Sequence, residues 1–304
     1  MRSPDQLCTL HSEPEGSRVL VHAFSGFLDA GAAVRTATAH ILASGERRLI
    51  ASFDSDELLD YRARRPTMTF VSDHFAAVDM PTITLHEITD PAGTPFLLLC
   101  GPEPDYQWNS FVAAIEDLVD RFGITQVVGL AAIPWPAPHT RPLGVTRHGN
   151  DQAHLAGRIP LVGTIEVPGH IGGMLELGLG QAGHQVLGLA AHVPHYLVQF
   201  DYPRAAITLL HELSETTGLV IPTESLVPAA DRAHAEVEAQ VDASVEVGSV
   251  VRALEQQYDA AAIAGPAMTS DLLADGEVPS GDQLAAQVER FLAEMGERES
   301  GDET

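Results

Sequence analysis

The chain has 304 residues, 45% of them hydrophobic, which is enough to bury a sizeable core in one large or two smaller domains. Its 42 acidic residues outnumber 17 basic residues, all of them arginine, and the formal net charge is −25. The absence of lysine excludes Schiff-base and P-loop lysine chemistry, and the negative charge opposes binding to nucleic acid or to anionic membranes.

Alternating strands and helices are predicted from about residue 18 to residue 219. Most of the strands are continuous apolar runs, as in a sheet that helices cover on both faces. The pattern predicts an α/β fold, a three-layer sandwich with a mainly parallel sheet. In chain order we expect strand 19–24, helix 32–42, strands 49–53, 68–71, 83–88 and 96–100, helix 109–122, strands 126–133 and 161–167, helix 171–182, strand 186–193 and helix 205–217.

The character of the chain changes after Pro222. From residue 229 onward, 17 acids face only four arginines, and the apolar residues follow helical spacing. We therefore predict an α/β sandwich domain over residues 1–221 and a helical C-terminal domain over residues 222–304. One apolar stripe comprises Val237, Val241, Val245, Val251, Leu254 and Tyr258, and a second comprises Leu284, Val288, Phe291 and Leu292. Such stripes pack on their own domain or on a second subunit more often than they bind a ligand.

Neither a membrane-spanning run of about 20 apolar residues nor a signal peptide is evident, so we expect a cytoplasmic protein. The two cysteines, Cys8 and Cys100, are too few for a disulfide framework, and Cys100 lies in an apolar run where it packs as a small hydrophobe.

Residues 53–66, FDSDELLDYRARRP, place three arginines directly after a run of acids. Two interpretations of Arg62, Arg64 and Arg65 stay open. The arginines either pair with the neighbouring acids and hold a loop against the fold, or form a cluster that binds an anion or a partner.

A second basic group follows the predicted strand 126–133. The segment PHTRP, residues 138–142, holds His139 and Arg141 in a loop made rigid by two prolines. Ligands of open α/β sheets bind outside such strand ends. If Arg62 or Arg65 folds beside His139 and Arg141, the four side chains form a candidate anion-binding pocket.

Several glycine motifs are weaker signals. Gly178, Gly180 and Gly183 match the spacing of a dinucleotide fingerprint but lie at the end of a predicted helix, not between a strand and a helix. The loop 168–173, PGHIGG, and Gly31 each follow a predicted strand and could bind an anion, but a tight turn explains both equally well.

Common catalytic and metal-binding signatures are absent from the sequence, which contains no GxSxG, HExxH or CxxC. His192 and His195 lie three residues apart at a predicted strand end, where a structural, hydrogen-bonded pair is expected over a metal site. Asp29 is predicted to cap the first helix. We assign no catalytic residue, no metal and no cofactor.

Taken together, five segments resemble the proteasome assembly chaperone two family in its actinobacterial branch. They are AFSGFLDAGAA (23–33), FDSDELLDYRARRP (53–66), GPEPDYQWNSF (101–111), PHTRPLGVT (138–146) and AAHVPHYL (190–197). The segment 279–292 is similar to the terminal helix of that family.

The resemblance implies a nucleoside-phosphorylase-like α/β fold with a helical C-terminal extension, in a homo-oligomer such as a trimer. Other branches contain chaperones that dock on proteasome subunits through a C-terminal hydrophobic–tyrosine–any-residue tail. This chain has Glu303 where that tail has tyrosine, so docking by that route is not expected. The family supplies no agreed catalytic residues.

Two functional hypotheses follow. The first is a non-enzymatic assembly chaperone or scaffold that works through its own oligomer and through proteasome subunits or another protein. The second is a nucleoside-phosphorylase-like enzyme or small-anion binder that uses Arg62, Arg65, His139 and Arg141.

Overall fold

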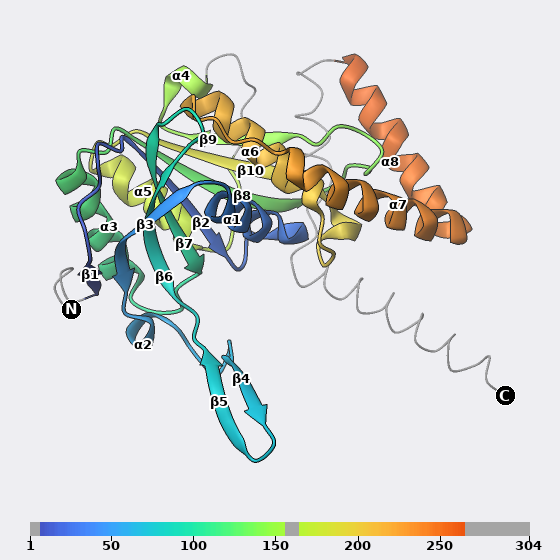
Figure 1. The fold of residues 1–304 in the computed structure, drawn as a ribbon. Coiled ribbons are helices and arrows are strands. Elements are labelled where there is room, and N and C mark those ends of the chain that lie inside the picture. Colours follow the sequence, from blue (N-terminus) through green and yellow to red (C-terminus); the bar gives the residue numbers. More distant parts are fainter. Residues whose placement is uncertain (1–6, 156–163, 265–304) are drawn as a thin grey trace.

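The computed structural model describes residues 7–155 and 164–264, with the backbone alone for residues 261–264. Its centre is an eight-stranded mixed sheet in the order β1-β3-β6-β7-β2-β8-β10-β9 (Figure 1). Strands β7, β2, β8 and β10 are parallel, and antiparallel strands extend both edges. The strands are β1 (Cys8–Leu10), β2 (Val19–Ser25), β3 (Glu46–Phe53), β6 (Ile83–Thr89), β7 (Pro95–Pro102), β8 (Gln126–Trp135), β9 (Val145–Gly149) and β10 (Val186–Pro194).

Helices cover both faces of this sheet, and adjacent strand residues point to opposite faces. On one face, Val21 of β2 belongs to a buried core that includes Ala37 and Leu209. On the other, Leu20 of β2 shares a core with Phe111 and Leu175. The first pair of helices is α1 (Ala33–Ser44) and α6 (Pro203–Thr217), and the second is α3 (Trp108–Phe122) and α5 (Ile171–Gln181). The predicted three-layer α/β sandwich is therefore confirmed.

Two sequence predictions within the sandwich need correction. The strand predicted at 161–167 is not formed over residues 164–167, and residues 161–163 lie outside the described part. The edge position beside β10 belongs instead to β9, which pairs with it antiparallel. An edge strand has only one neighbour and needs no continuous apolar run, which is why the polar sequence VTRHG gave no strand signal.

The strand predicted at 68–71 exists, but it is not part of the main sheet. It forms β4 (Thr67–Val71), which pairs only with β5 (His74–Asp79) in a separate two-stranded hairpin. This hairpin projects from the body of the protein beyond α2 (Ser55–Leu58) (Figure 1). Every residue of both strands is exposed.

The C-terminal part described by the structure consists of two helices, α7 (Val227–Ala243) and α8 (Val245–Ala264). The first apolar stripe is thus divided at Ser244, and Val245 is 85% exposed while Val251 and Leu254 are buried. Val237 of α7 belongs to the same core as α1 and α6, so α7 packs on the sandwich. The domain boundary at 221/222 stays a prediction, and the second stripe (284–292) lies outside the described residues.

The remaining short elements are α4 (Gln152–Leu155) and the 3₁₀ turns Ala30–Ala32, His195–Leu197 and Glu224–Leu226. Among the described residues, none of the helices combines the length and the apolar character needed to cross a bilayer.

Candidate functional site

The arginine-rich segment 53–66 is held by a helix cap within it and by contacts of Arg64 to the loop after β7. The Asp54 carboxylate caps α2 by accepting from the Asp56 amide at 3.1 Å. Arg64 forms an ion pair with Asp105 at 3.1 Å and also donates to the Glu103 carbonyl, so it attaches the segment to the loop after β7. Arg64 therefore forms an ion pair that holds the loop against the fold, but its partner Asp105 lies in a distant loop and is not one of the neighbouring acids.

The four predicted site residues fall into two separate pairs. Arg62 and Arg65 are exposed in the turn between α2 and β4, at the base of the projecting hairpin. His139 and Arg141 follow β8 and contact α7 and α8. Figure 1 shows these two helices away from the hairpin. The structure therefore does not bring these four side chains into one pocket, and a ligand role for Arg62 and Arg65 stays a prediction.

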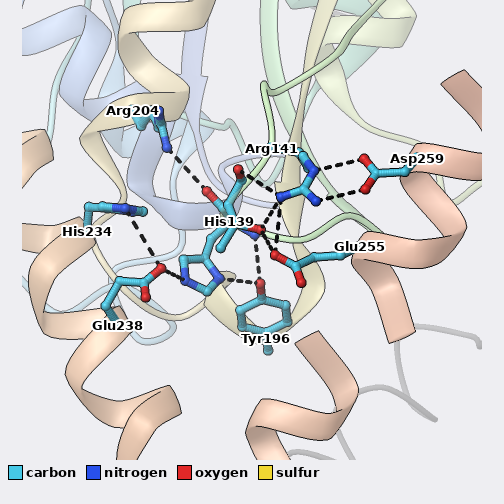
Figure 2. Close-up of polar contacts among 9 residues, drawn as sticks. His139, Arg141, Tyr196, Arg204, His234, Glu238, Glu255 and Asp259 are labelled. Atoms are coloured by element: carbon cyan, nitrogen blue, oxygen red, sulfur yellow. Dashed lines mark hydrogen bonds and ion pairs between the residues drawn. The ribbon is translucent and has the colours of Figure 1, made fainter. Parts of the chain in front are cut away.

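His139 lies at the centre of a hydrogen-bonded cluster that joins the sandwich to α7 (Figure 2). Its side chain is fully buried, and its Nε2 lies 2.9 Å from Glu238 Oε1 of α7. The Tyr196 hydroxyl lies 2.7 Å from His139 Nδ1 and 2.8 Å from the His139 backbone amide, which donates to it. The hydroxyl then donates to Nδ1, and Nε2 carries the proton that is donated to Glu238. Burial lowers the pKa of His139, although Glu238 acts against that shift, so the neutral ring is favoured.

Arg141 and its neighbours attach the same loop to α8. The Nε and Nη2 atoms of Arg141 donate to the two carboxylate oxygens of Asp259, each at 2.8 Å, and Nη1 donates to Glu255 at 3.2 Å (Figure 2). Glu255 also accepts from the Thr140 hydroxyl at 2.6 Å, and the Tyr258 hydroxyl donates to the Pro142 carbonyl at 3.1 Å. Each of the three guanidinium nitrogens of Arg141 thus donates to an acid of α8. We call this cluster, His139 to Pro142 with its partners on α7 and α8, the tail joint.

A metal ion is one chemistry the tail joint could offer. His139, His234 and Glu238 each present a ligand atom, and these atoms lie within 4.8 Å of one another. However, the two nitrogens of His139 already have hydrogen-bond partners in Tyr196 and Glu238. These two hydrogen bonds are sufficient to orient the His139 ring. Metal binding through Nε2 would first require that nitrogen to lose its proton.

The weaker motifs are explained by local structure. Gly31 has a φ of 64°, and a Cβ there would lie 3.0 Å from Tyr202, so this position requires glycine for a tight turn. His170, in the PGHIGG loop, caps α5 by accepting from the Gly173 amide at 3.0 Å. Asp29 accepts from the amides of Val34 and Arg35 in the first turn of α1, although the 3₁₀ turn Ala30–Ala32 separates it from that helix in the chain.

The predicted histidine pair has separate partners. His192 stacks on Trp135 with ring centres 3.8 Å apart, and its Nε2 lies 2.7 Å from the Thr146 hydroxyl. His195 contacts Tyr196 edge to face. Each ring therefore has its own structural contact.

Sequence reasoning found the loop of the tail joint but not its partners. Tyr196, Glu238, Glu255 and Asp259 are 57 to 118 positions away from the loop residues that they contact. The one signal in the sequence is the excess of acids from residue 229 onward. Helices rich in acids are expected to pack beside basic or hydrogen-bonding groups.

Comparisons with known proteins agree with this architecture. A Mycobacterium tuberculosis protein of unknown function is 46% identical, with a TM-score of 0.81 over 84% of this chain and 92% of that chain. A Corynebacterium glutamicum protein of unknown function is 39% identical, with a TM-score of 0.80 over 84% of this chain and 97% of that chain. A M. tuberculosis proteasome-assembly chaperone homologue is 27% identical, with a TM-score of 0.70 over 77% of this chain and 99% of that chain.

No curated protein matches the chain. The model of the PAC2 family matches residues 23–241, a span that includes all five segments on which the resemblance rests. The chain therefore belongs to the PAC2 family, the proteasome assembly chaperone two family that its motifs indicate.

Proposed function

We propose that this protein is a non-enzymatic, oligomeric assembly-chaperone-like scaffold of the cytoplasm, and that the β4–β5 hairpin is its contact arm. One observation carries the proposal, the apolar face of this hairpin. Met68 pairs with Val78 across the two strands, and Phe70 pairs with Phe75 with ring centres 5.1 Å apart. The side chains of Met68 and Phe70 are two residues apart on β4 and share a face.

This apolar face has no cover in the described part of the chain. Phe70 is 56% exposed and Phe75 is 64% exposed, and Met68 and Val78 are about half exposed. A solvated two-stranded hairpin is marginally stable, and a one-sided apolar face is typical of strands that pack on another surface. An exposed group of large apolar side chains is therefore best explained by an interaction site.

The partner we propose for this face is a second copy of the chain. Homo-oligomers with closed symmetry are the commonest assemblies of soluble proteins, and every copy brings the same hairpin. The side chains of this face are mainly uncharged, so two copies can meet there without bringing their acidic residues into contact. As a further partner we propose proteasome subunits. This proposal is supported by the 27% identical relative, which is described as a proteasome-assembly chaperone homologue.

The self-association test is a change in mass. Wild-type protein is expected to sediment as an oligomer, whereas Phe70→Asp combined with Phe75→Asp is expected to be monomeric. Removing two buried phenylalanine contacts costs about 3–6 kcal/mol of association, more than a hundredfold in the dissociation constant. Leu177→Asp is the matched control, because Leu177 is 57% exposed on α5 and should retain the oligomer. A wild-type monomer, or an unchanged mass of the double variant, would refute the contact arm.

The partner test is co-purification from cell extract with proteasome subunits. Tagged wild-type protein is expected to retain them, and the Phe70→Asp, Phe75→Asp protein is expected to lose them. Retention of proteasome subunits by a monomeric hairpin variant would place the docking surface elsewhere on the molecule. Absence of proteasome subunits from the eluate of the tagged wild-type protein would contradict a proteasome-related role.

A further inference from the structure

A row of four residues crosses the sheet on the face covered by α5. In the strand register, His22 of β2 lies opposite Gly129 of β8, Gly129 opposite Gly188 of β10, and Gly188 opposite His148 of β9. The row therefore reads histidine, glycine, glycine, histidine across four strands. Glu176 of α5 lies above the two glycines.

The glycines make room for the ionisable side chains. A Cβ on Gly129 would lie 2.5 Å from His22 Cε1, and a Cβ on Gly188 would lie 2.3 Å from His148 and 2.6 Å from Glu176 Oε1. Contacts this short are not tolerated, so any larger residue would push the imidazoles and the carboxylate away from the sheet. The two glycines thus permit a polar cluster between the sheet and α5, which runs from buried His22 to the exposed side chain of His148 on the edge strand.

The pKa values of His148 and His22 shift in opposite directions in this cluster. His148 Nε2 lies 3.2 Å from Glu176 Oε2, and Glu176 raises the pKa of His148 although burial opposes the shift. His22 is 3% exposed, and no described residue forms a hydrogen bond with its Nε2. Burial lowers the pKa of His22 to about 4, so its ring is neutral at pH 7. A buried nitrogen without a partner costs about 1–3 kcal/mol, which calls for a group that satisfies it.

A cavity of about 390 Å³ lies beside His22. Its lining includes Phe24 near the carboxyl end of β2, Ile133 near that of β8 and Ile171 at the N-terminus of α5, the region where open α/β sheets bind ligands. Its volume lies within the usual range for small-molecule pockets. The wall is mainly apolar, with Phe24 and Leu130 buried, Leu28 and Ile133 also in the lining, and Phe27, Ile165 and Val167 exposed at the mouth.

We infer that this cavity binds a small uncharged molecule with an apolar body and one hydroxyl group, and that the hydroxyl hydrogen-bonds to His22 Nε2. A hydroxyl both donates and accepts, so it suits either tautomer of a neutral imidazole. An anion is disfavoured because Glu103 and Glu176 both line the cavity. These carboxylates are already engaged, Glu176 by His148 and Glu103 by the amides of Ile171 and Phe27, so a cation is not required either.

Three probes with the same naphthalene ring system separate the effects of the apolar body, the hydroxyl and a negative charge. Isothermal titration calorimetry measures their affinities. 2-Naphthol carries the apolar body and the hydroxyl, naphthalene lacks the hydroxyl, and 2-naphthoate replaces it with an anion. 2-Naphthol is expected to bind about tenfold more tightly than naphthalene, the effect of one hydrogen bond to a buried group, and 2-naphthoate is expected to bind most weakly. Equal affinity for 2-naphthol and 2-naphthoate would overturn the inference, as would no binding of 2-naphthol.

Variants and a spectroscopic signal locate the bound probe. His22→Leu is expected to weaken 2-naphthol binding about tenfold and to leave naphthalene binding unchanged. Val167→Trp, at the exposed mouth, is expected to block both probes, whereas Val220→Trp, also exposed but outside the cavity lining, is the control and should bind normally. In wild-type protein, 2-naphthol should shift the ¹⁵N resonance of His22 Nε2, a readout that remains if His22→Leu fails to fold. An unshifted His22 resonance with bound 2-naphthol would place the molecule elsewhere and refute the site.

Discussion

Acidification from about pH 7.5 to about pH 5 is expected to lower the free energy of unfolding by about 4 kcal/mol through two histidines, His22 and His192. Burial lowers the pKa of each ring from the ordinary 6.5 to about 4. The unfolded chain therefore takes up a proton at each ring below about pH 6.5, while the folded rings stay neutral until about pH 4. Their stabilising effect is complete above pH 6.5 and is lost as the pH falls toward 4. At pH 5 each ring accounts for about 2 kcal/mol of the loss.

The surroundings of the two rings explain why their neutral forms are favoured. Around His22, burial is the largest effect, the Glu176 carboxylate opposes it, and His170 and His148 add to it. His192 is buried against Trp135, and burial is the cause of its shift.

Single replacements test these contributions one ring at a time. His22→Leu and His192→Phe are each expected to remove about 2 kcal/mol of the pH dependence, measured by urea unfolding followed by circular dichroism at pH values across the range. His74→Leu is the control for loss of a histidine, because His74 is exposed in the hairpin. A pH dependence in both buried-site variants equal to that of the wild type would contradict the assignment.

The centre of the fold was predictable because its elements carry strong local patterns. The parallel strands β7, β2, β8 and β10 are apolar runs, and α3 and α5 follow helical spacing between them. The edges were not predictable in the same way. β9 is polar because, among the described residues, it pairs with a strand on one side only. β4 has a normal strand sequence whose apolar face contacts nothing else in the described part of the chain.

Sites that depend on register or on distant segments were less accessible to sequence reasoning. Gly129 and Gly188 are inconspicuous small residues in apolar strands, and only the pairing of four strands places them between His22 and His148. The guanidinium of Arg141 predicts binding to a carboxylate or phosphate, but the sequence alone does not show which such groups lie near it. Its actual partners, Glu255 and Asp259, come from a helix more than a hundred residues later.

Loss of the His139 side chain is expected to release the C-terminal helices from the sandwich. His139→Ala removes the hydrogen bonds to Tyr196 and Glu238 and leaves a cavity at a fully buried position. Together these losses cost about 2–4 kcal/mol. The cost should appear as faster amide hydrogen exchange in α7 and α8, measured by mass spectrometry, with little change in β2 and β8 because the strands retain their pairing.

A second variant distinguishes the two halves of the tail joint. Arg141 contacts α8 through Glu255 and Asp259 and, within the described part of the chain, forms no ion pair with α7, so Arg141→Ala should accelerate exchange in α8 more than in α7. His139→Ala should act first on α7, because Glu238 is there. Arg35→Ala is the matched control, since Arg35 forms an exposed ion pair with Asp201 on the sandwich and should leave both helices unchanged. Equal protection of α7 and α8 in wild type and both joint variants would mean that apolar packing through Val237, Val251 and Leu254 alone holds the helices in place.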